Sequence, residues 1–244
     1  MKVLILAGGY GTRLKEIAQN RPKPLLPIND QPLLNYVLEC LKDLDGLSEV
    51  LVVTNAKFYD QFSEWAGGLN FAHPVKVIND GTTCPDDRLG SIGDIEFVID
   101  NENISEDLLV VGGDNLFDFN LKEYIAFAQA TPESVSIGAY DIEDIGQASK
   151  FGVLSLGKDG LIESFEEKPE NPRSSLVAMC FYYLPKQTLE LVSVYLKETN
   201  KADRAGDYIQ WLCEKGQVFG FKFTGKWYDI GSVEAYHEAQ QNFI

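Results

Sequence analysis

Short apolar or β-branched runs alternate with longer amphipathic stretches through the first half of the chain. Runs of a length typical of buried strands cover residues 3–7, 50–54, 75–78, 108–111 and 134–139. Patterns with helical spacing lie between them, at residues 32–44, 58–66, 92–100 and 121–130. A strand followed by a helix, repeated, predicts an α/β fold in which a mostly parallel sheet is flanked by helices and joined by right-handed crossovers.

The pattern changes in the second half of the chain. Strand patterns cover residues 151–156, 161–166 and 177–184, and turn-forming residues at 157–160 separate the first two. Later patterns predict helices at 186–197 and 206–215, a strand at 218–223 and a helix beginning at Ser232. We therefore expect a Rossmann-like sheet with a small antiparallel lobe on the substrate side, within one domain over residues 1–244.

Composition excludes several classes of protein. A chain of 244 residues with 45% hydrophobic content can bury a large core. Its apolar segments are shorter than the roughly 20 residues that cross a bilayer, and the first is too short for a secretory signal, so we expect a cytoplasmic protein without a membrane partner. Four cysteines without Cys-x-x-Cys spacing suggest neither a zinc site nor a disulfide framework.

The net charge of −16 bears on the kind of ligand. Nucleic-acid binding normally requires a basic face that displaces counterions, so we expect no nucleic-acid partner. A small phosphorylated ligand needs only a local positive patch, or a divalent metal that bridges carboxylates to phosphates.

A glycine-rich loop with nearby cations follows the first expected strand. Residues 6–14 read LAGGYGTRL and residues 21–27 read RPKPLLP. Glycine lets the backbone turn tightly and bring its N–H groups against an anion, and the carboxyl end of a strand is where open α/β sheets bind ligands. The loop predicts a phosphate site with Arg13 and Lys23 as its cations. Leu14 stands where a dinucleotide-binding loop has its third glycine, so a plain strand-to-helix turn stays open as an alternative.

Two acidic residues follow later apolar strands. Asp114 comes after a buried run and two glycines, and Asp229 lies between a strand and the helix that Ser232 can cap. Because carboxyl ends of parallel strands meet at one sheet edge, we expect both acids near the glycine loop. Mg²⁺ commonly takes one or two protein carboxylates and completes its shell with phosphate oxygens and water. The pair predicts a magnesium site, although a cap or turn explains each acid singly as well.

A third group of polar residues ends the strand pattern at 161–166. Residues 166–169 read EEKP, and residues 150–153 read KFGV. In isolation, a solvated charge cluster is the usual explanation for such a run.

Together and in this order, these motifs resemble the sugar-1-phosphate nucleotidyltransferases, the pyrophosphorylase family that makes nucleotide sugars. The resemblance runs from Met1 to about Tyr236 and is nearest to the glucose-1-phosphate thymidylyltransferases and mannose-1-phosphate guanylyltransferases. It implies Mg²⁺-dependent transfer of a nucleotidyl group from a nucleoside triphosphate, with dTTP or UTP favoured, to a hexose-1-phosphate, with glucose-1-phosphate favoured. Relatives are often dimers or tetramers, which leaves a homo-oligomer open.

The resemblance assigns roles residue by residue. Residues 1–140 would form a nucleotide-binding half and residues 141–244 a sugar-phosphate-binding half. Catalysis would fall to Arg13, Lys23 and Lys168, and Asp114 and Asp229 would hold Mg²⁺. The nucleotide would also contact Arg13, Lys23 and Asp114, and the other nucleotide-binding positions would be Leu6, Ala7, Gly8, Gly9, Gly11, Thr12, Asn79, Leu89 and Gly90. The sugar phosphate would contact Gly152, Glu167, Lys168 and Met179, the last of which replaces a glycine found in many relatives.

Alternatives stay open beside this assignment. Met179 leaves room for guanylyl or cytidylyl transfer to mannose-1-phosphate, heptose-1-phosphate or phosphocholine. A non-catalytic regulatory protein that binds nucleotide sugars is a further class, although retention of both metal acids argues against it. Little sequence follows the helix after Asp229, so we expect a single-activity enzyme without the β-helix domain of some relatives.

Overall fold

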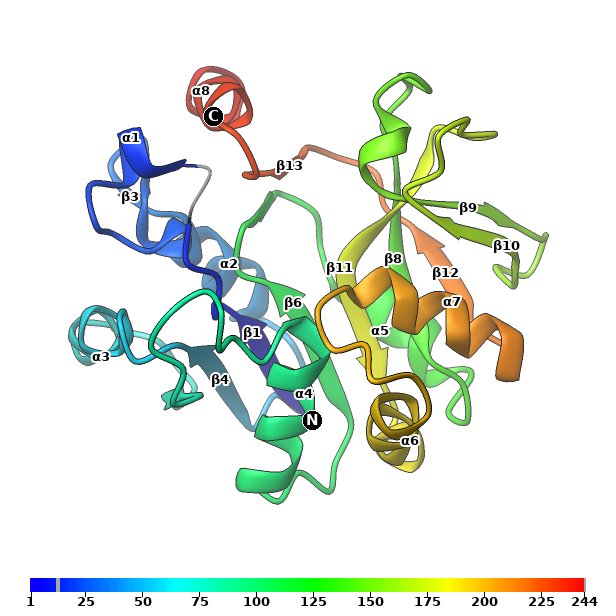
Figure 1. The fold of residues 1–244 in the computed structure, drawn as a ribbon, viewed down its shortest axis with the longest axis horizontal. Helices are drawn as coiled ribbons and strands as arrows, with labels where there is room; N and C mark the ends of the chain where they lie inside the picture. Colours follow the sequence, from blue (N-terminus) through cyan, green and yellow to red (C-terminus); the bar gives the residue numbers. More distant parts are fainter. Residues whose placement is uncertain (12–13, 244) are drawn as a thin grey trace. The chain divides into compact units, whose positions relative to one another are not determined.

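The computed structural model describes residues 1–11 and 14–243 and divides into two compact units (Figure 1). Unit 1 comprises Met1–Leu89, Val111–Leu121 and Gly225–Ile244, and unit 2 comprises Gly90–Val110 and Lys122–Thr224. Strand β6 (Leu108–Gly112) begins in unit 2 and ends in unit 1. Both units combine strands with helices, which confirms the expected α/β class. The predicted division into halves at residue 140 stays a prediction.

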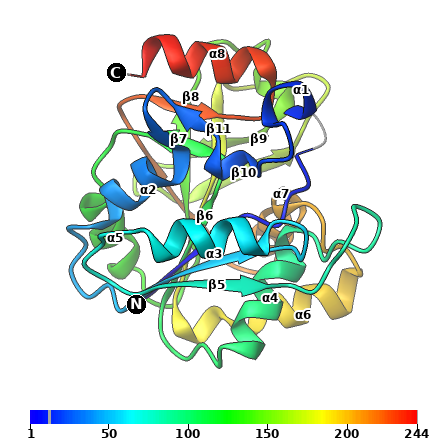
Figure 2. The same ribbon diagram turned by 90° about the vertical axis from the view of Figure 1, so that its left-hand side faces the viewer.

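Unit 1 is built on three parallel strands. Strand β4 (Glu49–Thr54) pairs with β1 (Lys2–Leu6) on one side and with β5 (Val75–Asn79) on the other. The centres of β1 and β4 are fully buried, as continuous apolar runs predict for parallel strands. Helix α3 (Tyr59–Gly67) contacts β5 and lies alongside it in Figure 2.

The rest of unit 1 consists of short elements and two further helices. Helix α2 (Leu33–Leu41) contacts strand β7 (Asn115–Phe117), and helix α8 (Val233–Asn242) contacts strand β13 (Trp227–Asp229). Strands β7 (Asn115–Phe117) and β13 (Trp227–Asp229) form an antiparallel ribbon. The oxygen Oγ of Ser232 accepts a hydrogen bond of 3.2 Å from Ala235 N and caps α8, which confirms the predicted cap. The remaining elements of the unit are α1 (Lys15–Ala18), η2 (Lys23–Leu25), β2 (Pro27–Ile28), β3 (Gln31–Pro32) and α8 (Val233–Asn242).

Unit 2 carries a largely antiparallel sheet with the strand order β10-β9-β11-β8-β12. Its strands are β8 (Ser136–Asp141), β9 (Gly152–Leu156), β10 (Ile162–Glu167), β11 (Leu176–Leu184) and β12 (Phe219–Lys222). Strand β8, expected among the parallel strands, instead runs antiparallel to β11 and parallel to β12. Burial patterns fix which residues of a strand face the core but not its partner, so the sequence could not predict this pairing.

Aromatic side chains fill the core of unit 2. The ring of Phe223 lies 5.2 Å from that of Tyr124 and 5.7 Å from that of Phe181, measured between centroids. Gly138 makes room for them, because a Cβ there would lie 2.9 Å from atoms of both Phe181 and Phe223. The helices of the unit are α4 (Ser91–Asn101), α5 (Lys122–Gln129), α6 (Glu190–Thr199) and α7 (Ala205–Lys215), with short 3-10 turns η3 (Ala148–Lys150) and η4 (Lys186–Thr188).

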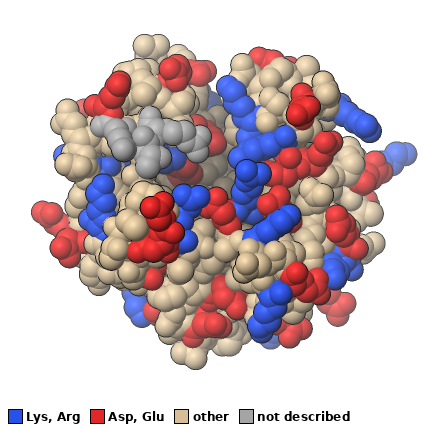
Figure 3. Space-filling view, viewed as in Figure 1, with Lys and Arg blue, Asp and Glu red and all other residues tan. Residues whose placement is uncertain are grey.

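Acidic and basic side chains are interspersed over the face drawn in Figure 3. The net charge of −16 therefore does not form one unbroken acidic surface on that face. None of the helices in the described parts of the chain is both long and apolar enough to span a membrane.

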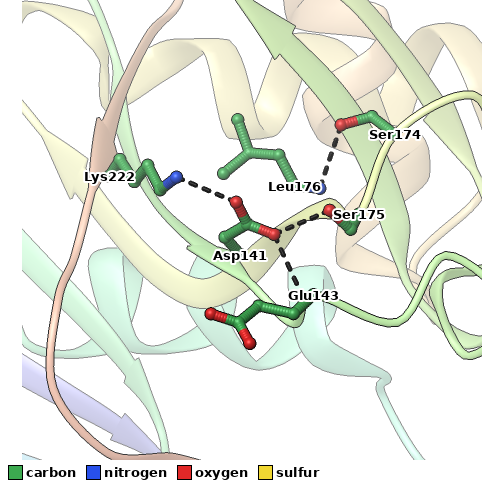
Figure 4. Close-up of polar contacts among 6 residues, drawn as sticks. All are labelled: Asp141, Glu143, Ser174, Ser175, Leu176 and Lys222. Atoms are coloured by element: carbon green, nitrogen blue, oxygen red, sulfur yellow. Dashed lines mark hydrogen bonds and ion pairs between the residues drawn. The ribbon is translucent and has the colours of Figure 1, made fainter.

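The carboxylate of Asp141 ties three segments of unit 2 together (Figure 4). It accepts hydrogen bonds from Ser175 Oγ at 2.7 Å and from Glu143 N at 3.1 Å, and it pairs with Lys222 Nζ at 2.9 Å. These donors, Ser175 first and Lys222 next, lower the pKa of Asp141 from 3.8 to about 2. A lowered pKa means that the ionised carboxylate favours the folded state, so its stabilisation is present above pH 3.8 and is lost as the pH falls towards 2.

Asp141→Asn is therefore expected to lower the midpoint of thermal unfolding at pH 7, and the difference from wild type is expected to shrink as the pH falls from about 4 to about 2. Glu143→Gln is the matched control, because it removes the same charge while keeping the backbone N–H that Asp141 uses. A constant difference across this pH range would contradict the assignment of the pKa shift to these contacts.

Candidate active site

The described part of the glycine-rich loop leaves β1 in unit 1 and is held by buried polar side chains. Ala7 N donates to Val53 O at 2.9 Å, which extends the pairing of β1 with β4. Thr54 Oγ1 donates to Ala7 O at 3.2 Å, and Asn55 Nδ2 donates to Gly8 O at 2.8 Å. Both anchoring residues are fully buried. The backbone path of the loop is thus fixed by the end of the neighbouring strand.

The structure describes the three predicted loop glycines, Gly8, Gly9 and Gly11. At Gly9 and Gly11 an added Cβ would meet no described atom within 4 Å, and Gly11 has a φ of +63°, a region that favours glycine. Gly8 contributes its carbonyl to Asn55, as above. Thr12 and Arg13, predicted to bind the triphosphate, lie outside the described residues.

Lys23 and Asp114 form an ion pair. Lys23 Nζ lies 2.5 Å from Asp114 Oδ2, and the two side chains are 18% and 33% exposed. Lys23 begins the short turn η2, and its neighbours restrict the backbone, because Pro22 precedes the turn and Pro24 lies within it. Asp114 follows Gly113, whose N–H donates to Leu6 O at 2.9 Å and so fastens this segment to the end of β1. The contact brings together two residues that the sequence placed in one site.

Asp229 lies on the ribbon that begins next to Asp114. Strand β13 ends at Asp229, which stands opposite Asn115 in β7, and Ile230 N donates to Asp114 O at 2.9 Å. Trp227 Nε1 donates to Asn115 Oδ1 at 2.7 Å and fixes the ribbon from its other side. The backbone pairing thus brings the two acidic positions next to each other within unit 1.

This donor set fits a hard cation. In the described part of the chain no three His, Cys, Asp or Glu side chains cluster as a ready-made metal site. Two carboxylates on adjacent backbone segments suit Mg²⁺, which commonly takes one or two protein carboxylates while phosphate oxygens and water supply the remaining positions. Asp114 and Asp229 fit the predicted role of metal ligands, which stays a prediction.

The segment after β5 is tied back to the glycine loop. Tyr10 Oη donates to Thr82 Oγ1 at 3.0 Å, and the Thr82 hydroxyl and N–H both donate to Asp80 Oδ1 at 2.7 Å. Burial raises the pKa of the Asp80 carboxyl, and it also raises the pKa of Tyr10. Asn79, a predicted nucleotide-binding residue, accepts a hydrogen bond from Gly81 N at 2.9 Å and so shapes its own turn. Leu89 ends unit 1 on this segment.

Gly90, the last residue of the predicted nucleotide-binding set, lies in unit 2. It precedes α4 with a φ of +82°, and a Cβ there would lie 2.6 Å from Ala202 O. Ile92 N donates to the same carbonyl at 2.9 Å. Both the backbone conformation and the close approach require glycine here.

The predicted sugar-phosphate residues also lie in unit 2. Gly152 begins β9 directly opposite Glu167, which ends β10. Lys168 follows with a φ of +46° and donates its N–H to Phe151 O at 3.0 Å. The Glu167 side chain is 11% exposed, whereas that of Lys168 is 52% exposed and its Nζ lies 3.7 Å from Glu167 Oε1. The structure thus brings Gly152, Glu167 and Lys168 together.

Met179 lies within an irregular part of β11. The register between β11 and β8 shifts between Ala178 and Tyr182, and Met179 is 1% exposed. Its role in lining a sugar pocket stays a prediction.

Thr54, Asn55, Asp80 and Thr82 were missed by the motif analysis. All four are buried polar residues at or just after the end of an apolar strand, close to the pattern that drew attention to Asp114. That pattern could have found them, because a polar side chain buried at a strand's end needs a partner.

Comparison with known proteins shows to which family the chain belongs. The family model described as nucleotidyl transferase matches residues 2–244. The chain belongs to the nucleotidyl transferase family. The resemblance inferred from the motifs is thereby confirmed.

Similar members of the nucleotidyl transferase family include two curated proteins. The bifunctional protein GlmU of Methanocaldococcus jannaschii is 28% identical, with 95% of this chain and 51% of the relative aligned. The glucose-1-phosphate adenylyltransferase of Photobacterium profundum is 28% identical, with 99% of this chain and 66% of the relative aligned. The chain thus spans about half to two thirds of the length of these relatives.

A solved structure shares the fold of this nucleotidyl transferase family member. The UDP-glucose pyrophosphorylase complexed with UDP-glucose aligns with a TM-score of 0.82 and 23% identity over 99% of this chain and 97% of its own. The expected fold class is thereby confirmed.

Proposed function

We propose that the chain transfers a nucleotidyl group from a nucleoside triphosphate to a sugar-1-phosphate and releases pyrophosphate. The observation that carries the proposal is the ribbon of β7 and β13, which sets Asp229 next to Asp114 while Asp114 pairs with Lys23. Two carboxylates and a lysine beside a glycine-rich loop suit a triphosphate with its cation. The family match supports the same reaction class.

In the proposed reaction, an oxygen of the sugar-1-phosphate attacks the α-phosphorus of the triphosphate. The bond from that phosphorus to the oxygen bridging to the β-phosphorus breaks, and pyrophosphate leaves with the electron pair. The attacking phosphate is already largely ionised at neutral pH, so no side chain has to remove a proton. Catalysis then rests on positioning the two anions and on neutralising the charge that develops.

Different residues of the chain bind the two substrates and neutralise their charge. In unit 1, Lys23 neutralises phosphate charge, and the backbone of Gly8, Gly9 and Gly11 lies against the triphosphate. Asp114 and Asp229 would hold Mg²⁺, which when bound would supply positive charge to the phosphate oxygens. In unit 2, the half-exposed Lys168 binds the phosphate of the sugar and Glu167 accepts hydrogen bonds from its hydroxyls.

The substrates are the finer part of the proposal. We propose glucose-1-phosphate as the acceptor, which the name of the Photobacterium profundum relative supports. The motifs favour dTTP or UTP as the donor, whereas that same relative is named an adenylyltransferase, so ATP is the second candidate. A cytoplasmic location, and action without nucleic acid or membrane, belong to the same proposal.

A matrix of nucleoside triphosphates against sugar-1-phosphates tests the substrate assignment. Each of dTTP, UTP, ATP, GTP and CTP is combined with glucose-1-phosphate, mannose-1-phosphate or phosphocholine in the presence of Mg²⁺, and pyrophosphate release is measured. We expect the highest kcat/KM for glucose-1-phosphate with dTTP or UTP. A preference for ATP would correct the donor, and a preference for phosphocholine would overturn the acceptor class.

A further inference from the structure

The side chain of Glu167 lies in a narrow slot of unit 2. Glu167 is the last residue of β10, and its side chain is 11% exposed. Phe165, two residues earlier, projects from the same face of the strand because side chains alternate along it. Helix α7 packs against β10. One wall of the slot therefore comes from the sheet and another from a helix.

The sheet wall of the slot depends on Gly152. Gly152 pairs with Glu167 across the β9–β10 ladder. A Cβ at Gly152 would lie 2.5 Å from Cζ of Phe165 and 3.1 Å from Oε2 of Glu167. The missing side chain thus leaves space that the phenyl ring and the carboxylate share.

The helix wall depends on Gly206, the second residue of α7. A Cβ at Gly206 would lie 1.8 Å from Oε2 and 2.3 Å from Cδ of Glu167. The backbone of Gly206 has no positive φ, so the space and not the conformation requires glycine. The carboxylate therefore lies directly against the backbone of the first turn of α7.

Charged residues around the slot act on the ionisation of Glu167 in opposite directions. Burial raises the pKa of Glu167, Lys168 and Arg204 act to lower it, and Asp207 acts to raise it. Arg204 and Asp207 flank Gly206 at the start of α7, and the first turn of a helix favours a negative charge. The contacts that place the carboxylate also influence its ionisation.

We propose that Gly206 is a positioning residue for Glu167, fixing where the carboxylate meets the hydroxyls of the sugar and so setting the choice among sugar-1-phosphates. The inference rests on the proposed function for its substrate. A methyl group at position 206 displaces the carboxylate from the slot, so the contact with the sugar is lost while the triphosphate site in unit 1 is unchanged. Gly206 acts through Glu167 and touches no reacting atom.

Gly206→Ala is expected to raise the KM for the sugar-1-phosphate about tenfold or more, to leave the KM for the triphosphate within about threefold, and to reduce discrimination between epimeric sugar-1-phosphates. Gly216→Ala is the matched control, because it lies just after the same helix and an added Cβ there would meet no described atom within 4 Å. In a Glu167→Ala background, which removes both the sugar contact and the atoms that the added methyl would meet, Gly206→Ala is expected to have no further effect on the KM for the sugar-1-phosphate. Equal losses for both substrates, or the same loss from Gly216→Ala, would overturn the proposal.

Two further measurements keep the test decisive. If Gly206→Ala does not fold, the double variant Gly206→Ala/Glu167→Asp should fold as well as Glu167→Asp alone, because the shorter acid withdraws from the added methyl.

If the wild-type protein turns over no substrate pair, the proposed function fails separately, and NMR titration of Glu167 then tests the slot alone. Gly206→Ala should bring the pKa of Glu167 down towards its ordinary value as the carboxylate moves into solvent; an unchanged pKa would contradict the slot.

Discussion

Asp114→Asn and Asp229→Asn are each expected to lower kcat for Mg²⁺-dependent pyrophosphate release by about 10²-fold or more while leaving the fold intact. Each substitution removes the carboxylate of one of the two acidic residues whose backbone positions the β7–β13 ribbon sets next to each other. An amide is a weaker ligand for a hard cation than a carboxylate, so the Mg²⁺ concentration for half-maximal activity should also rise. Steady-state kinetics over a Mg²⁺ titration measures both effects.

Asp30→Asn is the control for this pair, because it removes one negative charge from an exposed position of unit 1. Circular dichroism and thermal unfolding of all three variants separate loss of activity from loss of structure. Asp114→Asn also takes away the charged partner of Lys23, so a modest fall in stability is expected for it but not for Asp30→Asn. Activity near the wild-type level in both Asp114→Asn and Asp229→Asn would exclude the metal assignment.

Gly113→Ala is expected to destabilise the protein by about 1–3 kcal/mol and to reduce activity together with stability. A Cβ at Gly113 would lie 2.7 Å from Leu6 O and 3.1 Å from Cγ of Pro24. The first atom belongs to the backbone of β1, which pairs with β4 and cannot withdraw easily. The second lies next to Lys23, and Asp114 directly follows the substitution, so both members of the ion pair should shift.

Urea unfolding of Gly113→Ala measures the free energy of unfolding. Gly67→Ala is the control, because this residue lies in α3 and a Cβ there would meet no described atom within 4 Å. In a helix alanine is favoured over glycine, so the control should be neutral or slightly stabilising. A Gly113→Ala variant as stable as wild type would show that the segment after β6 is not packed against β1 as described.

Long periodic segments of this fold were predictable, and short pairings were not. The patterns at residues 50–54 and 92–100 correspond to β4 and α4 to within one residue at each end, because they carry the spacing of a buried strand and an amphipathic helix. Strands β2 and β3 have two residues each, too few for any period to be detected. The direction of β8 depends on partners distant in the sequence, which its own pattern does not encode.

Residue types and their positions at strand ends were enough to select the candidate site, but not to describe its contacts. Lys23 and Asp114 were assigned to one site, and their ion pair is consistent with that assignment. The support of the loop by Thr54 and Asn55 was not foreseen, because each forms its hydrogen bond to a residue 47 positions away. The slot around Glu167 likewise depends on Gly206. The sequence does not show that these two residues are in contact, so the need for a glycine there could not be predicted.

The most direct test of the central claim is the stoichiometry of the products. The wild-type protein is incubated with Mg²⁺, a nucleoside triphosphate and a sugar-1-phosphate, and pyrophosphate and nucleotide sugar are quantified by mass spectrometry. The proposed reaction requires equal amounts of the two products, and none of either when the sugar-1-phosphate is omitted. Pyrophosphate released without the sugar-1-phosphate, or without a matching amount of nucleotide sugar, would contradict it.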